Sequence, residues 1–201
     1  MTSSSVPSRG PNTEGRRLYR RPSALSLRPR TIDVALKRIK LLLCDVDGVL
    51  TDASVFVGGE TEIKQFNIHD GLGLVTLRHE GIKVGWVSSR PSAATEWRAR
   101  ELKVDFLHQE KSSKVAVVER LIGQTGFGWK EICYMGDDIV DLGVLKRVGV
   151  AIAVPNATAE AKAAADYVTK AAGGHGAVRE VVELILKAQG KWEGVVREHE
   201  A

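Results

Sequence analysis

The chain has 201 residues, of which 43% are hydrophobic, and this is enough for one domain of ordinary size with its own core. It contains no apolar run of about 18 residues, so no transmembrane helix is predicted. The net charge of +4 is unevenly divided: residues 1–40 carry ten basic and two acidic residues, whereas residues 41–201 carry 19 basic and 23 acidic ones. The mildly acidic remainder gives little support to nucleic-acid binding. The two cysteines, Cys44 and Cys133, lie in apolar runs and are expected to be reduced thiols of a cytoplasmic protein.

The composition divides the chain into three parts. Residues 1–31 are rich in Ser, Arg and Pro and show no apolar period, which predicts a disordered basic extension. The same composition also fits an organellar transit peptide, a solvated tail or a start site placed too far upstream. Residues 32–190 are predicted to form the folded domain, beginning with a short helix over 32–39, and residues 191–201 a flexible tail.

From residue 40 onward, strand-like and helix-like segments alternate. In chain order the predicted elements are strand 41–46, a β-hairpin of 54–57 and 63–66, helix 72–80, strand 83–87, helix 92–102, strand 104–107, helix 112–122, strand 131–135, helix 140–147, strand 150–154, helix 158–165, strand 167–169 and helix 177–189. This alternation predicts an α/β fold of the Rossmann-like, three-layer kind, with a parallel sheet between two layers of helices and the hairpin as a small insertion.

Polar residues follow several of these strands, at the sheet edge where such folds bind ligands. Asp45 and Asp47 come with the end of the first strand, and positions two apart on a strand share a face. Two close carboxylates repel each other and favour a cation or a shared proton, so the pair suits magnesium beside a nucleophile and an acid/base group. The other junctions contribute Ser88, Arg90, Lys114, Asp137, Asp138 and Asp141.

The order of these residues resembles the haloacid dehalogenase superfamily, whose members are mostly magnesium-dependent phosphatases, over about residues 40–190. The resemblance implies that Asp45 is the nucleophile that forms an aspartyl-phosphate, and that Asp47 is the general acid and then the general base. Ser88 would hydrogen-bond the phosphoryl group, and Lys114 would neutralise charge on it and on Asp45.

The same resemblance implies a magnesium site. Asp137 would join Asp45 and the backbone carbonyl of Asp47 around the ion, and Asp138 and Asp141 would be outer ligands or anchors. The expected metal-site residues are therefore Asp45, Asp47, Asp137 and Asp138.

The spacing of these residues leaves no room for a cap domain. Only 40 residues separate Asp47 from Ser88, and only 25 separate Ser88 from Lys114. We therefore expect the capless branch of the superfamily, with a site open to solvent unless a neighbouring subunit covers it. An open site favours hydrolysis over phosphate transfer to a second sugar, and small-molecule specificity then implies an oligomer.

Four segments resemble the 3-deoxy-D-manno-octulosonate 8-phosphate phosphatase family more closely: 47–52, 66–73, 136–141 and 173–180. This resemblance implies hydrolysis of that sugar-acid phosphate in lipopolysaccharide biosynthesis. It also implies a homotetramer, whose hairpins form a central barrel and whose C-terminal tail helps to close a neighbour's site. The implied substrate contacts are Asp70, Arg90, His69, Gly174 and Arg179.

Two departures from the family pattern leave alternatives open. His69 stands where the family commonly has Arg, and histidine cannot form the bidentate carboxylate contact of arginine. Ser88-Ser89 stands where Thr-Gly is common, which keeps the hydroxyl group. The alternative substrates are acylneuraminate or deaminoneuraminate 9-phosphates. A non-enzymatic alternative is a binding protein that uses the basic N-terminal segment.

Overall fold

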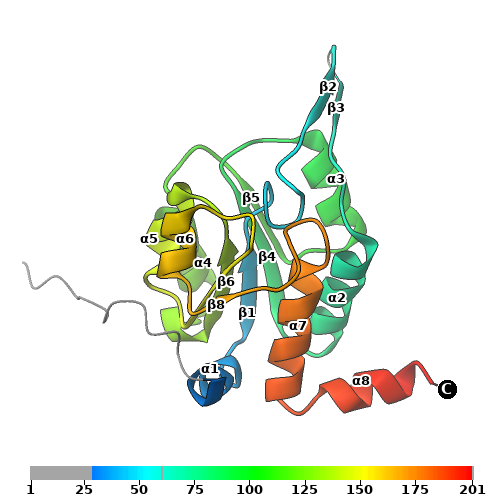
Figure 1. Cartoon of the computed structure of the whole chain (residues 1–201), viewed down its shortest axis with the longest axis vertical. Coiled ribbons are helices and arrows are strands. Elements are labelled where there is room, and N and C mark those ends of the chain that lie inside the picture. The colour runs from blue at the N-terminus through cyan, green and yellow to red at the C-terminus, as the bar shows by residue number, and fades with distance from the viewer. Residues whose placement is uncertain (1–28, 60, 201) are drawn as a thin grey trace, which may run out of the picture.

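The apolar runs of the sequence form a six-stranded parallel sheet in the computed structural model, which describes residues 29–59 and 61–200 (Figure 1). The strand order is β5-β4-β1-β6-β7-β8. The strands are β1 Leu41–Cys44, β4 Lys83–Ser88, β5 Phe106–Gln109, β6 Ile132–Gly136, β7 Val150–Ala153 and β8 Tyr167–Val168. The chain leaves β1 toward β4 on one side and later returns to β6 on the other, so the carboxyl end of β1 lies at the switch point where such sheets bind ligands.

Helices cover both faces of the sheet, which is why the central strands are apolar along their whole length (Figure 1). On one face α7 packs against α1 and α2, and on the other α5 packs against α4 and α6. The helices are α1 Pro29–Leu36, α2 Ile68–His79, α3 Ala93–Glu101, α4 Lys114–Thr125, α5 Leu142–Leu145, α6 Ala159–Ala164, α7 Ala177–Ala188 and α8 Trp192–Glu198, with 3-10 turns at Trp129–Glu131 (η1) and Ile139–Asp141 (η2). No helix within the described ranges is long and apolar enough to cross a membrane.

A short antiparallel hairpin takes the place of a cap domain. Its strands, β2 Phe56–Gly58 and β3 Thr61–Ile63, project beyond the main sheet (Figure 1). The predicted three-layer α/β fold with a hairpin insertion is confirmed.

Among the differences from the predicted bounds, three have clear local reasons, whereas the hairpin strands, α2 and β5 are shifted by a few residues. β1 ends at Cys44, so Asp45 and Asp47 lie in the turn after the strand and not on it. The expected helix over 140–147 is the turn η2 followed by the single-turn helix α5. Helix α4 continues past Gly123 and ends at Gly126, whose left-handed φ of 72° lets its N–H bond back to Ile122 O.

The two ends of the chain are only partly described. The predicted basic extension over 1–31 lies almost wholly outside the described residues, which begin at residue 29. The expected tail over 191–201 contains helix α8, and its flexibility stays a prediction.

Candidate active site

A buried lysine joins two carboxylates at the carboxyl end of β1. Lys114, the first residue of α4, places its Nζ 2.8 Å from Asp45 Oδ1 and 2.7 Å from Asp141 Oδ1. All three residues are buried. The backbone N–H of Asp45 donates to Met135 O of β6 at 2.9 Å, which continues the strand register up to the carboxylate. The structure thus brings together Asp45 and Lys114, as the sequence predicted.

Asp141 organises the loop that follows β6. Its Oδ1 accepts a hydrogen bond from the hydroxyl of Tyr134 at 2.5 Å, and its Oδ2 accepts from the backbone N–H groups of Asp137 and Asp138 at 3.0 and 3.2 Å. A Cβ on Gly136 would lie 2.7 Å from the Cβ of Asp141, so this close approach requires glycine. The carboxylate of Asp141 therefore holds Lys114 and shapes the acidic loop at the same time.

The site carries more negative charge than its lysine compensates. Burial raises the pKa of Asp45 to about 6, against the attraction of Lys114. Burial and then repulsion from Asp45 and Asp141 raise the pKa of Asp137 to about 8. Burial alone would lower the pKa of Lys114, but the two carboxylates that it contacts outweigh this and raise it. A cluster of carboxylates with this surplus of negative charge is stable only when further positive charge is present.

Three carboxylates are placed to hold a divalent cation. Asp45, Asp137 and Asp141 each offer an oxygen within 4.8 Å of the others. The Oδ1 atom of Asp137 is buried and has no hydrogen-bond partner among the described residues. Gly48 lets Asp137 approach the turn after β1, because a Cβ there would lie 2.1 Å from Asp137 Oδ2. A compact set of oxygen ligands with surplus negative charge fits magnesium.

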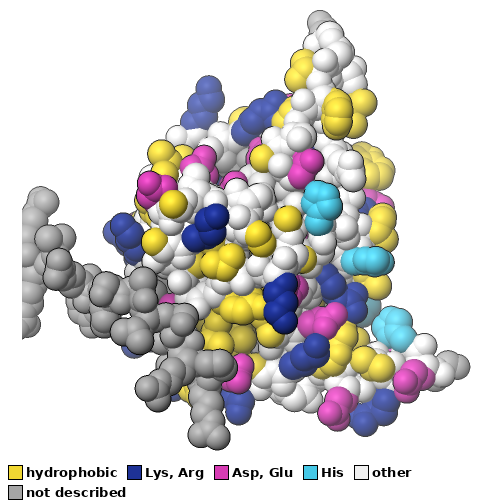
Figure 2. All heavy atoms as spheres, viewed as in Figure 1, with side chains coloured by type: hydrophobic (Ala, Val, Ile, Leu, Met, Phe, Trp, Pro, Cys, Tyr) yellow, Lys and Arg dark blue, Asp and Glu magenta, His cyan; other side chains and the backbone are white. Residues whose placement is uncertain are grey.

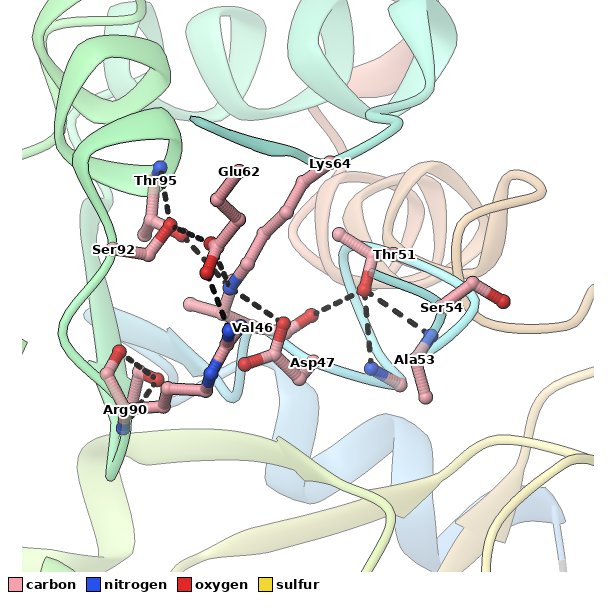
Figure 3. A network of polar contacts seen from close by, with 12 residues as sticks. Val46, Asp47, Thr51, Ala53, Ser54, Glu62, Lys64, Arg90, Ser92 and Thr95 are labelled. Atoms are coloured by element: carbon pink, nitrogen blue, oxygen red, sulfur yellow. Dashed lines mark hydrogen bonds and ion pairs between the residues drawn. The ribbon is translucent and has the colours of Figure 1, made fainter. Parts of the chain in front are cut away.

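Two expected metal-site residues direct their carboxylates elsewhere. Asp138 is exposed, and its Oδ1 accepts from the N–H of Ile139 at 2.6 Å as the N-cap of η2, so Asp141 takes the place in the cluster that was expected for Asp138. The carboxylate of Asp47 points to Lys64, whose Nζ lies 2.6 Å from Asp47 Oδ1 (Figure 3). A contact of the Asp47 backbone carbonyl with magnesium stays a prediction.

Ser88 and Arg90 lie at the end of β4, beside the base of the hairpin. Ser88 Oγ accepts from Arg90 N and lies 3.1 Å from Arg90 O. The guanidinium of Arg90 forms an ion pair with Glu62 of β3, whose other oxygen accepts from the hydroxyl of Ser92 at 2.6 Å (Figure 3). Arg90 is nearly half exposed and lies at the open edge, whereas Ser88 is buried.

Asp70 has a structural place that differs from the expected substrate contact. It is 1% exposed, and its two oxygens accept from the backbone N–H groups of Gly176 and Arg179 at the start of α7. Its carboxylate therefore fixes the loop of residues 173–176 before α7, which we call the glycine-rich loop. Gly174 of this loop has a φ of +70° and donates to Val49 O at 3.0 Å, next to the turn after β1. His69 is exposed on the first turn of α2.

The side chain of Arg179 is also directed away from the expected contact. Its Nε lies 3.0 Å from Glu183 Oε1, one turn further along α7, and its guanidinium lies 5.1 Å from the ring centroid of Trp192 in α8. Arg179 thus joins α7 to α8 in this chain.

Asn156, in the turn after β7, connects the glycine-rich loop to the turn after β1. Its Nδ2 donates to Gly48 O at 3.0 Å, and its Oδ1 accepts from Gly173 N at 2.9 Å. A Cβ on Gly173 would lie 1.8 Å from Gly48 O, so the two backbones touch directly. This packing holds the turn that carries Asp47 against the glycine-rich loop.

Three contributors to the site were missed from the sequence: Lys64, Glu62 and Tyr134. Tyr134 lies within an apolar strand and gave no signal separate from the core. Lys64 gave a weak one, since alternation places it on the same face of the expected strand as the apolar residue Phe66.

Comparison with known proteins gives consistent matches. A family model described as haloacid dehalogenase-like hydrolase matches residues 106–181. The 3-deoxy-D-manno-octulosonate 8-phosphate phosphatase KdsC of Escherichia coli is 39% identical over 166 residues, which is 81% of this chain and 88% of that protein.

Two solved structures resemble the fold closely. The 3-deoxy-D-manno-octulosonate 8-phosphate phosphatase of Moraxella catarrhalis, in complex with magnesium ion, phosphate ion and a KDO molecule, has a TM-score of 0.84 and 38% identity over 86% of this chain and 99% of that one. The cobalt-bound deoxy-D-mannose-octulosonate 8-phosphate phosphatase of Haemophilus influenzae has a TM-score of 0.76 and 37% identity over 78% of this chain and 92% of that one.

The charge imbalance makes a prediction for Asp137→Asn. The carboxyl pKa is about 8 in the folded protein and near 4 in an unfolded chain, so the wild type loses stability as the pH rises from about 4 to about 8. The side chain of asparagine stays neutral over this pH range, so the variant does not lose this stability. Without metal at pH 7, the variant should therefore unfold at a higher temperature than the wild type, and magnesium should raise that temperature less.

The matched control is Asp138→Asn, because Asp138 is exposed and asparagine caps a helix equally well. Thermal unfolding of this variant, with and without magnesium, should follow the wild type. A lower unfolding temperature for metal-free Asp137→Asn, or a full response to magnesium, would contradict the assignment of Asp137 to the cation site.

Proposed function

The chain belongs to the haloacid dehalogenase-like hydrolases, within the 3-deoxy-D-manno-octulosonate 8-phosphate phosphatase family, and on this premise we propose that it hydrolyses 3-deoxy-D-manno-octulosonate 8-phosphate through an aspartyl-phosphate on Asp45. It is a magnesium-dependent phosphoric monoester hydrolase. The main observation behind this mechanism is the contact of Lys114 with Asp45. Asp45 lies two residues before Asp47 in the same turn.

The contacts of Asp45 suit a nucleophile. Lys114 and the N–H of Val46 both contact its Oδ1, at 2.8 Å each. Both of these contacts are to Oδ1, so we assign the attack on phosphorus to Oδ2. The lysine also keeps the carboxylate ionised despite its burial.

The reaction then needs one proton carrier and two displacements at phosphorus. In the first, Asp45 Oδ2 bonds to phosphorus while the ester oxygen leaves, and Asp47 gives that oxygen its proton. In the second, water attacks phosphorus, Asp47 takes a proton from it, and the bond to Asp45 breaks to release phosphate. Ser88 and Lys114 would bind the phosphoryl oxygens. Magnesium held by Asp45 and Asp137, with Asp141 holding Lys114 and the loop beside them, would neutralise charge on those oxygens.

Replacing the nucleophile should separate chemistry from folding. Asp45→Asn is expected to lower the turnover rate to less than about a thousandth of the wild-type value, because an amide does not displace an alkoxide. The control is Asp52→Asn in the same turn, where Asp52 is exposed and accepts from Ser54 N, a role that asparagine fills equally well. The rate of phosphate release is measured for both variants and for the wild type. Full activity of folded Asp45→Asn would exclude this mechanism.

The substrate proposal is supported by the curated relatives, which carry this name at 38–40% identity. Arg90, at the open edge beside Ser88, is a candidate for the sugar carboxylate, although it is paired with Glu62 in this structure. His69 replaces an arginine that is common in the family, so acylneuraminate and deaminoneuraminate 9-phosphates are the alternatives to test.

A panel of phosphate esters tests the substrate class. With magnesium, kcat/KM for 3-deoxy-D-manno-octulosonate 8-phosphate is expected to exceed that for nine-carbon ulosonate 9-phosphates and hexose phosphates by at least about tenfold. The hexose phosphates are the control, because they present the same phosphate without a carboxylate. A preference for the nine-carbon acids would move the assignment to the alternative, and no preference for either acid would leave a general phosphatase.

We also propose that the protein is a cytoplasmic homotetramer that associates through its hairpins. Cys44 and Cys133 are both free and buried, in keeping with a reducing compartment. Phe56 and Ile63 are cross-strand partners on one face of the hairpin, 63% and 60% exposed. Figure 2 shows apolar side chains over this projecting part of the molecule. A two-stranded hairpin is marginally stable alone, so a partner surface would stabilise it.

A charge on this face should prevent assembly. Phe56→Glu is expected to shift the particle from about four times the 21.9 kDa chain to a smaller species, because it would bury a carboxylate without a partner. Val34→Glu is the control, since Val34 is a 55% exposed apolar residue of α1, which lies at the opposite end of the molecule from the hairpin (Figure 1). Light scattering during gel filtration gives the masses. A monomeric wild type, or a tetrameric Phe56→Glu variant, would refute assembly through the hairpins.

A further inference from the structure

A buried lysine at the base of the hairpin has no part in the mechanism so far. The side chain of Lys64 is completely buried, one residue after β3. Its Nζ lies 2.6 Å from Asp47 Oδ1, 3.3 Å from Thr95 Oγ1 and 3.9 Å from Glu62 Oε1 (Figure 3). A buried ammonium is costly unless it is paired, so this position needs a carboxylate close by.

The short contact identifies Asp47 as the main partner. Glu62 is already engaged, because one of its oxygens accepts from Ser92 and the other pairs with Arg90. Thr95 is fully buried near the start of α3 and holds the ammonium from the side opposite the turn after β1. Lys64 is thus fixed between α3 and the turn, and its charge is directed at Asp47.

This contact decides where the Asp47 carboxylate lies. The turn after β1 also presents Asp45, and Asp137 and Asp141 lie beside it with surplus negative charge. Lys64 attracts the Asp47 carboxylate to the hairpin side, away from those three. Asp47 remains one quarter exposed there, so it faces the open edge at which an ester would arrive.

We propose that Lys64 is a positioning residue that holds Asp47 for proton transfer to and from the phosphate ester. The inference rests on the proposed function, in which Asp47 is the acid and the base. Lys64 contacts Oδ1, which leaves Oδ2 to give its proton to the leaving oxygen as the phosphorus–oxygen bond breaks, and later to take one from water. Lys64 itself transfers no proton.

The dependence of rate on the leaving group tests this role. Lys64→Met keeps an unbranched side chain that is shorter by one atom, and it removes the charge. An ester with a good leaving group, such as p-nitrophenyl phosphate, needs little help from an acid, whereas phenyl and alkyl phosphates need much. We expect Lys64→Met to lower kcat/KM by about tenfold to a hundredfold for alkyl phosphates, a loss equal to part of the rate gain that a general acid supplies. For p-nitrophenyl phosphate the expected loss is less than about threefold.

Esters whose leaving groups carry no charge are used, so that the loss of a contact between Lys64 and a substrate carboxylate cannot imitate the result. The ratio kcat/KM is compared because it covers only the steps up to the first irreversible one, transfer to Asp45. Asp47→Asn should show the same steepened dependence, to a greater degree. Lys83→Met is the matched control, because Lys83 forms a 2.8 Å ion pair with Asp105 far from these residues, and it should keep the wild-type dependence.

Thr95→Val keeps the test decisive if Lys64→Met does not fold. It removes the second hydrogen bond of the ammonium at nearly constant volume, and a smaller change in the same direction is expected. Equal losses for all esters, or a wild-type dependence in the folded variants, would overturn the inference while the wild type remains an active phosphatase. A wild type that hydrolyses none of the esters would instead overturn the proposed function, and this inference with it.

Discussion

Repulsion among carboxylates at the end of β1 is the constraint on which the site depends. Asp45, Asp137 and Asp141 lie within 4.8 Å of one another in a buried position, and Lys114 compensates only part of their charge. The parallel sheet makes this possible, because β1 and β6 are neighbours in register and deliver their following loops to the same edge. The fold thus concentrates negative charge that can bind a cation, and the cation can in turn bind an incoming phosphate.

Close backbone packing is the second condition of the site. Gly48, Gly136 and Gly173 each lie where a Cβ would overlap a neighbouring atom of the site. Asn156 then ties the turn after β1 to the glycine-rich loop through both ends of its amide. The acidic residues are therefore placed by backbone contacts over most of their surroundings, and few side chains need to be ordered when substrate binds.

The sequence predicted which residues meet at the edge better than what each of them does there. Asp45 and Lys114 were identified because the strand–helix junctions of a parallel sheet meet at one edge and because the order of the residues resembles a known family. Asp138 and Asp141 were given the same expected role, but a tight turn directs one carboxylate outward as a cap and the other inward to two amides. Such a choice depends on loop geometry that residue spacing does not determine.

Asp70 and Lys64 show the same limit over longer distances. Asp70 was expected at the substrate because of the motif around it, but its partners are amides more than 100 residues away, at the start of α7. Lys64 carried no motif at all, and its contact with Asp47 exists only because the chain passes the turn after β1 as it returns from the hairpin. Polar partners that join distant segments are the part of a site that local sequence patterns reveal least.

The hairpin has two chemically different faces. Alternation along the chain places Glu62 and Lys64 toward Arg90 and Asp47, while Ile63 points outward beside Phe56. If the apolar face joins another subunit as proposed, that contact lies one residue away from the groups that contact Asp47. A shift of the hairpin on assembly would then also shift Lys64 and Glu62, and the proposed assembly and the proposed proton transfer would be coupled through one short segment.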